Sequence, residues 1–557
     1  MTDSFPSTLT GPTSKERKYD RQLRLWAASG QQELEQSRVL LVNSDGPVDS
    51  DNAPVAGVIG VETLKNLVLP GVGGFTIVDP AVVTDTDLGV NFFVSEESLG
   101  RSRAQETCKY LQELNPDVKG EFSSQPILEL LQNPHFLTQF RLVLVTGPIR
   151  ECTLRTISQE ARRLSIPLIY MHSVGFYAAV SIQMPSVFPI VETHPSPEST
   201  QDLRLTNPWP ELAATVKKIE NLDTLDDHQH GHVPYLLLLL YYLKKWKQTH
   251  GGNLPKTYQE KSEFRDLVRS GARTNNPEGG EENFDEAVAA VLKSINPWSL
   301  SSGLRDIFNM EQCTNLTPES NNFWIIAFAV KKFYDTHGVL PLPGSLPDMK
   351  AQSADYIWLQ NIYKSKARVD AAEVEATVRA TEAQLNRGTQ VPRKEIEVFC
   401  KNAAHIKVIK GRDIPFFQGE NTDPHVINAV RANLANHPEP LVQIFIALKV
   451  LDRLVSEYQN ADPKPSSSPL DVPENWTRVL SQIVPDSVLE PEEARERIEA
   501  AMAEVRRAGT AELHNISSLA GGVAAQEALK LLTRQYVPLD NTFIFDGVGS
   551  KGDMFRL

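Results

Sequence analysis

Short apolar segments alternate with helical patterns over the first 180 residues. The segments 38–44, 74–79, 140–145 and 166–170 are apolar and rich in β-branched residues, as buried strands are. Between them, apolar residues recur at three- and four-residue spacing, which predicts amphipathic helices. Strands that alternate with helices in this way predict a doubly wound α/β sheet with parallel strands.

The pattern changes after about residue 177. Long segments with helical periodicity then follow one another with few strand signals, and a strand pattern returns only near the end of the chain. We therefore expect a Rossmann-type α/β domain interrupted by a large insertion. Its first part covers residues 1–177, the mainly helical insertion covers 178–475, and residues 476–557 return to complete the α/β domain.

Composition limits the classes of function. The 557 residues include 56 Lys and Arg against 70 Asp and Glu, a net charge of −14. Such an acidic chain is a poor candidate for non-specific binding to nucleic acid or to an anionic membrane. The longest apolar run, 233–243, is too short to span a bilayer, and the N-terminus lacks the apolar core of a secretory signal. We expect a protein of the cytoplasm or nucleus.

The first strand, the glycine-led helix and the second strand have the layout of a nucleotide-binding βαβ unit. Gly60 precedes Asp79 by 79 − 60 = 19 residues, the usual offset for a carboxylate that accepts hydrogen bonds from ribose hydroxyls. However, the tight glycine pair expected after the first strand is absent. Residues 45–51 contain three aspartates and a proline instead, which would repel phosphates and remove a donor.

We interpret Gly60 and Asp79 as a degenerate nucleotide site that does not function. The alternative for Asp79 is a solvated strand end without a ligand. Whether residues 45–57 form an ordered insertion or a gene-model artefact stays open.

Several motifs resemble those of one family. Residues 18–26 (KYDRQLRLW) resemble the opening signature of the ThiF/MoeB-like adenylating fold of ubiquitin-like-protein activating enzymes. Segments 202–205 (DLRL), 208–212 (PWPEL), 516–522 (ISSLAGG) and 535–538 (QYVP) are similar in particular to the regulatory, pseudo-adenylating subunits of the heterodimeric neddylation activating enzymes.

The resemblance implies a function. A catalytic partner subunit would bind ATP and magnesium and carry an acceptor cysteine, while this chain would bind no cofactor of its own. The complex would adenylate the C-terminus of a Nedd/Rub-type ubiquitin-like protein, transfer it to the partner's cysteine and pass it on to a conjugating enzyme. The chain alone would be inactive.

Three departures from the motifs of active family members support this expectation. Val90 stands where the resemblance implies an arginine, Arg103 stands in place of a lysine, and the strand 143–148 lacks the aspartate that would lie near the metal. Acyl-adenylate formation needs cations on the departing pyrophosphate and a carboxylate that holds magnesium.

Arg21 is the candidate catalytic residue. The resemblance implies that the arginine of the Tyr-x-Arg-Gln element reaches the ATP phosphates of the partner subunit and stabilises charge in trans, as an arginine finger does. The alternatives are that Arg21 pairs with a local acid such as Asp20 or caps a helix. Arg24 is a second candidate, which could equally lie on the solvated face of the same helix.

No acceptor thiol or metal site is expected in this chain. Cys108 fits a helix core, Cys152 begins a helix in the α/β part, and Cys313 and Cys400 lack the flanking pattern of an acceptor thiol. The alternating histidines of segment 226–234 have a spacing that suits a polar loop better than a zinc site.

Four other functions remain as alternatives. One is the corresponding subunit of a SUMO activating enzyme, which lacks so large an insertion. Another is a self-sufficient homodimeric adenylating enzyme, which would need the missing groups. The third is an interaction scaffold without a catalytic contribution. The fourth, a dinucleotide-dependent dehydrogenase, conflicts with the absent phosphate-binding glycines.

Overall fold

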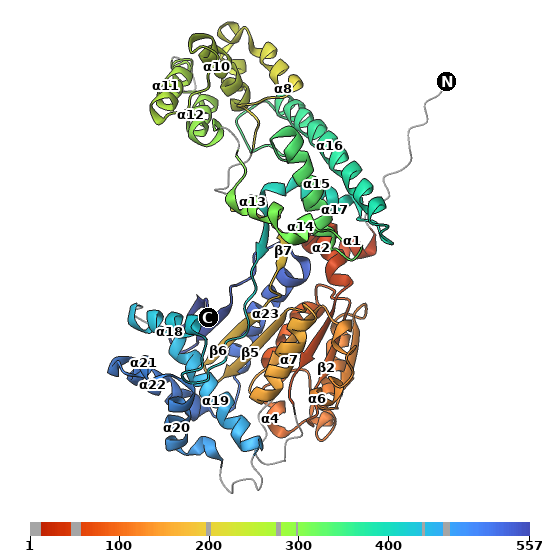
Figure 1. The fold of residues 1–557 in the computed structure, drawn as a ribbon, viewed down its shortest axis with the longest axis vertical. Coiled ribbons are helices and arrows are strands. Elements are labelled where there is room, and N and C mark those ends of the chain that lie inside the picture. Colours follow the sequence, from red (N-terminus) through yellow and green to blue (C-terminus); the bar gives the residue numbers. More distant parts are fainter. Residues whose placement is uncertain are drawn as a thin grey trace. The chain divides into compact units, whose positions relative to one another are not determined.

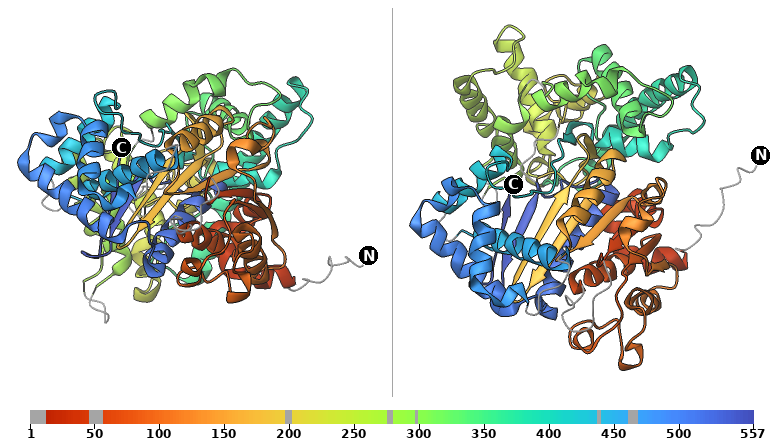
Figure 2. Two further views of the ribbon diagram at one scale, coloured as in Figure 1. Left: turned by 90° about the horizontal axis from the view of Figure 1, so that it is seen from below. Right: turned by 60° about the horizontal axis from the view of Figure 1, so that its bottom comes forward.

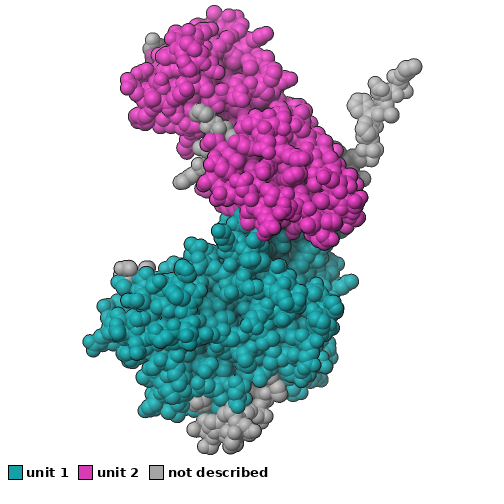
Figure 3. All heavy atoms as spheres, in the orientation of Figure 1, with its two compact units in different colours: residues 1–190, 408–557 teal, residues 191–407 magenta. Residues whose placement is uncertain are grey.

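The computed structural model describes residues 13–45, 57–196, 202–274, 280–296, 299–436, 440–460 and 468–557. The chain forms two compact units (Figure 3). Unit 1 comprises residues 1–190 and 408–557, and unit 2 comprises residues 191–407.

Unit 1 is built on an eight-stranded mixed sheet in the order β10-β9-β6-β5-β4-β1-β2-β3. Strands β5, β4, β1, β2 and β3 are parallel, and β6, β9 and β10 extend the sheet with antiparallel pairings. The bounds of these strands are β1 Arg38–Val42, β2 Gly74–Val78, β3 Lys119–Ser123, β4 Leu142–Thr146, β5 Leu168–Val174, β6 Tyr177–Gln183, β9 Thr542–Asp546 and β10 Lys551–Phe555.

The central strands β1, β2 and β4 are mostly apolar because helices cover both faces of the sheet (Figure 2). In β1, Val39 and Leu41 point to one face, and Leu40 and Val42 point to the other. All four side chains are fully buried. The run of apolar residues in β1, from which the sequence predicted a buried parallel strand, is explained by the helices on both faces of the sheet.

The helices of unit 1 lie before, between and after the strands (Figure 1). Their bounds are α1 Ser14–Lys18, α2 Asp20–Glu35, α3 Val58–Val68, α4 Asp85–Leu88, α5 Arg103–Leu114, α6 Ile127–Leu130, α7 Glu151–Arg163, α18 Pro424–Asn436, α19 Val442–Asn460, α20 Pro473–Ile483, α21 Asp486–Leu489, α22 Glu492–Ala508 and α23 His514–Thr533. Short 3₁₀ turns lie at Glu96–Ser98, Leu137–Gln139 and Pro469–Asp471.

Unit 2 is mainly helical, as its periodicity predicts. The apolar run within α10 is enclosed in a core with α11, α12 and part of α16, so it forms a buried helix. The bounds of the unit 2 helices are α8 Pro210–Ala214, α9 Asp227–His230, α10 Tyr235–Thr249, α11 Tyr258–Arg269, α12 Glu282–Ser294, α13 Ser302–Asn309, α14 Glu311–Thr314, α15 Asn322–His337, α16 Ser353–Gln384 and α17 Arg393–Lys401, with 3₁₀ turns at Thr215–Ile219, Leu222–Thr224 and Ala403–His405. None of the helices within the described ranges is long and apolar enough to cross a membrane.

The two units correct the expected domain boundaries. The predicted insertion, 178–475, is longer than unit 2 at both ends. Strand β6 continues the main sheet because it pairs with β5 and β9, and α19 packs its apolar face against Ala179 and Ile544 of that sheet. A short two-stranded sheet of β7 (Phe188–Val191) and β8 (Ile406–Ile409) lies where the chain leaves and re-enters unit 1. The α/β fold with a helical insertion is confirmed.

The order of the strands defines where a ligand would bind. From β1 the chain moves outward to β2 and β3 and then returns to place β4 on the opposite side of β1. In open α/β sheets, ligands bind at such a reversal, outside the carboxyl ends of the two strands. A ligand is therefore expected at the carboxyl ends of β1 and β4.

The packing of α23 against α3 gives a test of the fold. A Cβ atom on Gly521 would lie 2.9 Å from Glu62 Cβ and 3.0 Å from the Ile59 carbonyl oxygen, so the two helix backbones would have to separate. We expect Gly521→Ala to lower the free energy of unfolding by about 1–3 kcal/mol in urea titrations. On the neighbouring Gly522, a Cβ would meet no atom within 4 Å. Gly522→Ala should raise the free energy of unfolding by about 0.5–1 kcal/mol. Equal effects of the two substitutions would contradict this packing.

Candidate functional site

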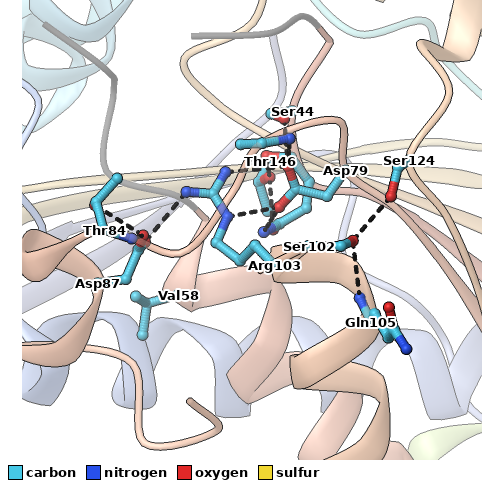
Figure 4. Close-up of polar contacts among 12 residues, drawn as sticks. Ser44, Val58, Asp79, Thr84, Asp87, Ser102, Arg103, Gln105, Ser124 and Thr146 are labelled. Atoms are coloured by element: carbon cyan, nitrogen blue, oxygen red, sulfur yellow. Dashed lines mark hydrogen bonds and ion pairs between the residues drawn. The ribbon is translucent and has the colours of Figure 1, made fainter. Parts of the chain in front are cut away.

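Asp79 follows β2 and is fully buried, which excludes the solvated strand end considered above. Its carboxylate accepts five hydrogen bonds (Figure 4). Ser44 Oγ donates at 2.6 Å, Asn43 Nδ2 at 3.1 Å and the Ala81 amide at 3.0 Å. The Arg103 guanidinium donates twice, through Nε at 2.7 Å and Nη2 at 3.1 Å.

Arg103 connects two buried carboxylates. Besides its two bonds to Asp79, its Nη1 donates to Asp87 Oδ1 at 3.1 Å. Asp87 is fully buried and also accepts from the Thr84 amide at 2.8 Å and the Thr84 hydroxyl at 2.9 Å. The flat guanidinium fork holds both acids at once, which the point charge of a lysine ammonium could not do in the same geometry.

The charge of Arg103 keeps Asp79 ionised. Burial opposes ionisation of the carboxyl group, but the adjacent guanidinium and the hydrogen bonds from Ser44 and the Ala81 amide hold the pKa of Asp79 below its ordinary value. Because each of its oxygens already has donors, the Asp79 carboxylate has no capacity left for ribose hydroxyls.

Residues at the ends of β1 and β4 contact one another directly. The Thr146 hydroxyl lies 2.9 Å from the Asn43 carbonyl oxygen and 3.1 Å from Asn43 Oδ1, and it donates into this pair of acceptors. Gly60 lies against the same residues, since a Cβ there would be 2.5 Å from Thr146 Cγ2 and 2.7 Å from Leu41 Cδ1. Gly60 therefore serves the close approach of α3 to the sheet.

The N-terminus of α3 is occupied by a carboxylate of the chain itself. Glu512 Oε2 accepts from the Val58 amide at 2.7 Å, and Oε1 accepts from the Ile59 amide at 3.3 Å and from the Ser517 hydroxyl at 3.2 Å. A helix N-terminus at this place in a nucleotide-binding fold usually holds phosphate. Burial raises the pKa of Glu512 to about 7, although the two amides and Ser517 lower it in part.

The described residues thus do not fit a nucleotide in the pose that the βαβ layout predicts. Asp79, the carboxylate that would accept from the ribose, is paired with Arg103, and the two described amides at the start of α3 already have an acceptor. Between β1 and β4, Thr146 is hydrogen-bonded to Asn43. Asp45 pairs with Arg150, at 2.7 Å from Oδ2 to Nε. The other acids of the unusual segment after β1, and the question of an ordered insertion, lie within residues 46–56, outside the described residues.

Arg21 lies in the first turn of α2 and its side chain is exposed. Asp20, its expected local partner, pairs instead with Arg24 across one helical turn, at 3.0 Å between Oδ2 and Nη2. Within the ranges that the structure describes, the Arg21 guanidinium has no ion-pair partner. The sequence alternative in which Arg21 pairs with Asp20 is therefore wrong, and the trans role of Arg21 stays a prediction.

The candidate thiols differ in exposure. Cys152 is exposed, while Cys108, Cys313 and Cys400 are buried. Burial raises the pKa of Cys108 and Cys313 to about 11 and that of Cys400 to about 12, so these three thiols are poor nucleophiles at neutral pH. Cys108 packs in the core of unit 1, which confirms its assignment from the sequence.

The histidines of segment 226–234 include one buried member. His230 Nδ1 lies 2.7 Å from Glu281 Oε1, and its ring stacks on Phe284. His228 and His232 stack on each other at the surface. Within the described ranges, no group of three or more His, Cys, Asp or Glu side chains could hold a metal ion.

Sequence reasoning missed two residues of this site. Glu512 lies more than 450 positions from the amides it contacts, and no local motif points to it. For Asp87 the sequence holds a weak indication. Thr84 and Asp87 have the spacing of a capping box, which places Asp87 in the first turn of α4.

Comparison with known proteins decides the family. Residues 19–557 match the model of the ThiF family. The chain belongs to the ThiF family. Its full-length relatives include the "NEDD8-activating enzyme E1 regulatory subunit" of Xenopus laevis, at 37% identity over 98% of this chain and 99% of that protein. The proteins of that name from Drosophila melanogaster (34%, 98% and 98%) and, as AXR1, Arabidopsis thaliana (33%, 97% and 96%) are also similar.

These relatives confirm the resemblance seen in the sequence motifs. This ThiF-family chain is similar along its whole length to regulatory subunits of neddylation activating enzymes. Among solved structures, E. coli MccB has a TM-score of 0.26 at 15% identity, over 38% of this chain and 56% of that chain.

The Arg103 cluster gives a second test. Arg103→Ala leaves Asp79 and Asp87 buried without a cation, and we expect the free energy of unfolding to fall by about 3–5 kcal/mol in urea titrations. Arg103→Lys should lie between wild type and Arg103→Ala, because an ammonium cannot reproduce the fork. The control is Arg101→Ala, which removes an exposed guanidinium that lies 3.8 Å from the Glu106 carboxylate, an acid that also accepts from Ser98 Oγ, and it should cost less than about 1 kcal/mol. A loss in Arg103→Ala as small as in this control would contradict the role of the cluster.

Glu512 gives a pH-dependent prediction. Its pKa is raised from 4.5 to about 7 in the folded chain, so the folded state binds more protons than the unfolded state between these pH values. Its contribution to stability is therefore highest below pH 4.5, falls as the pH rises and levels off above pH 7.

We expect Glu512→Gln to remove this fall, because the amide oxygen can still accept from the Val58 amide. At pH 8 the variant should exceed wild type by up to about 3 kcal/mol of unfolding free energy, and near pH 4.5 the two should converge. The exposed Glu113→Gln is the control and should follow the wild-type profile. If the unfolding free energy of Glu512→Gln changed with pH in parallel with that of wild type, the predicted effect of the buried carboxylate would be contradicted.

Proposed function

We propose that this chain is the regulatory subunit of a heterodimeric enzyme that adenylates the C-terminus of a Nedd/Rub-type ubiquitin-like protein. The observation that carries the proposal is the self-occupied nucleotide site. The Asp79 carboxylate is neutralised by Arg103, and the amides that open α3 are bound to Glu512. A chain with such a site needs a partner that binds ATP and magnesium.

The names of the relatives support the same assignment, because a regulatory subunit implies a catalytic one. We propose that the catalytic subunit carries the acceptor cysteine, and that the chain itself binds no cofactor and is inactive alone. A conjugating enzyme would receive the modifier from that cysteine. We place the complex in the cytoplasm or nucleus.

Arg21 is the residue that we assign to the reaction. Its guanidinium is exposed and has no ion-pair partner within the described ranges, so contact with a phosphate would not first require breaking an ion pair of this chain. In the proposed complex it donates to the phosphates of ATP held by the partner and stabilises the charge that develops on the departing pyrophosphate. Arg24, paired with Asp20, is the less suitable residue of the two.

Exposed apolar side chains mark where the partner would dock. Leu25 on α2 and Leu519 on α23 are 55% and 45% exposed, and Phe92, at 69%, stacks on His514 at the start of α23. Because α23 packs against α2 and α3, these side chains lie on adjoining elements of unit 1. Burial of such a surface would supply the apolar part of an obligate interface.

The proposal is tested with the reconstituted heterodimer. We expect ATP–pyrophosphate exchange and a thioester on the partner only when both subunits are present, and no exchange by this chain alone. Arg21→Ala should lower the exchange rate by about 10²–10³-fold at unchanged dimer formation, because a cation at the phosphates is lost. The matched control, Arg24→Ala on the next turn of α2, should stay within about threefold.

Each alternative function has its own result. Exchange at the wild-type rate with Arg21→Ala would favour an interaction scaffold. Turnover by the isolated chain would favour a self-sufficient homodimeric enzyme, and with it the proposed division of labour would fail. A preference of the heterodimer for SUMO over the Nedd/Rub-type protein would assign it to the SUMO pathway.

A further inference from the structure

A groove in unit 2 has no role in the function proposed above. It lies between α16, α17 and the segment 342–345 and has a volume of about 380 Å³. Figure 1 shows α16 and α17 side by side in this unit. The size is that of a ligand site rather than of a packing defect.

Small residues open this groove. Ala367 and Ala371 line it from α16 and Gly344 lines it from the segment 342–345. A Cβ on Gly344, whose φ is +75°, would lie 2.7 Å from Ala367 Cβ, so glycine permits the close approach here. The segment is fixed to α16 by the Leu342 amide, which donates to the buried Asp370 carboxylate at 3.0 Å. The groove is therefore built into the fold on both sides.

The two helices run antiparallel, and one end of the groove carries charges of both signs. Arg393 at the start of α17 lies 3.5 Å from the Glu375 carboxylate of α16 and 3.0 Å from the Glu397 carboxylate, measured from its Nε. All three side chains line the groove. At this end, two carboxylates share one guanidinium, so the acids outnumber the cation.

The other end carries cations without acids. Lys364 and Arg368 lie one helical turn apart on α16, and Lys401 lies at the end of α17, eight residues beyond Arg393. Lys364 donates to the amide oxygen of Gln360. Within the described parts of the chain, none of these three cations has a carboxylate within 4.0 Å.

The three cations lie along one groove although the net charge of the chain is −14. Like charges that share a groove repel one another, and an anionic ligand would relieve the repulsion. The groove is larger than a single phosphate, and small residues such as Gly344, Ala367 and Ala371 line it between the charged groups, which suits an extended chain with acidic side chains at one end.

We propose that the groove formed by α16, α17 and residues 342–345 binds an extended acidic segment of a partner protein, with its carboxylates on Lys364, Arg368 and Lys401. The contact is electrostatic at one end and steric at the other. It lies entirely within unit 2 and does not depend on the adenylation chemistry assigned to the complex.

The test measures binding of a fluorescein-labelled hexaglutamate peptide to the full-length chain by fluorescence anisotropy. We expect saturable binding that weakens as salt is added, because exposed charges are screened. The double variant R368E/K401E should raise the Kd at least about tenfold. Ala371→Trp fills the groove without a change of charge and should also abolish binding. Circular dichroism melting confirms that each variant is folded.

The control is K247E/K293E, which changes the net charge by the same amount at two unit 2 lysines on α10 and α12, away from the groove. Binding by this control should stay within about twofold of wild type. An equal loss in the two double variants, or no loss in R368E/K401E, would overturn the proposal. Tighter binding of labelled hexathymidylate than of the peptide would also overturn it, since the groove would then select phosphates.

Discussion

The buried ion cluster of Arg103 with Asp79 and Asp87 is the constraint on which the nucleotide-like site depends. Two carboxylates without exposure to water are tolerated only because one guanidinium fork and a set of hydroxyl and amide donors satisfy them. The cluster fixes the end of β2 to the start of α5 and to α4. In doing so it uses the carboxylate that a ribose would need.

At the phosphate position, too, a group of the chain itself stands where a ligand would bind, and this group is Glu512. In a nucleotide-binding fold the amides at the start of the first helix are left for a ligand. Here a side chain from the return segment of the chain accepts from them, so the positive end of α3 is satisfied inside the protein. In this βαβ unit, the groups that would bind ribose and phosphate are thus both bound by side chains of the chain itself. The βαβ arrangement is kept, and these internal contacts stabilise it.

The sequence predicted the sheet well and the site in part. Apolar runs placed the strands β1, β2, β4 and β5 because burial on both faces leaves a strong local signal. The insertion boundaries failed because β6 and α19 owe their place to distant partners in the sheet rather than to their own pattern. The missing glycines and Arg103 in place of a lysine indicated a degenerate site. The role of Glu512 could not be predicted, because it depends on a contact with Val58, 454 positions earlier in the chain.

Exposed arginines and lysines can bind another molecule, whereas buried ones are paired with acids of the chain itself. Arg103 has its donors committed to buried acids, whereas Arg21 is exposed and Asp20, its nearest acid in the helix, is taken by Arg24. The same contrast recurs within unit 2, where Arg393 is neutralised by two glutamates while Arg368 and Lys401, in the same groove, lack acids among the described residues. An unpaired cation at the surface costs little in water, so Arg21, Arg368 and Lys401 can each remain unpaired in the free chain and still be available to an anionic ligand.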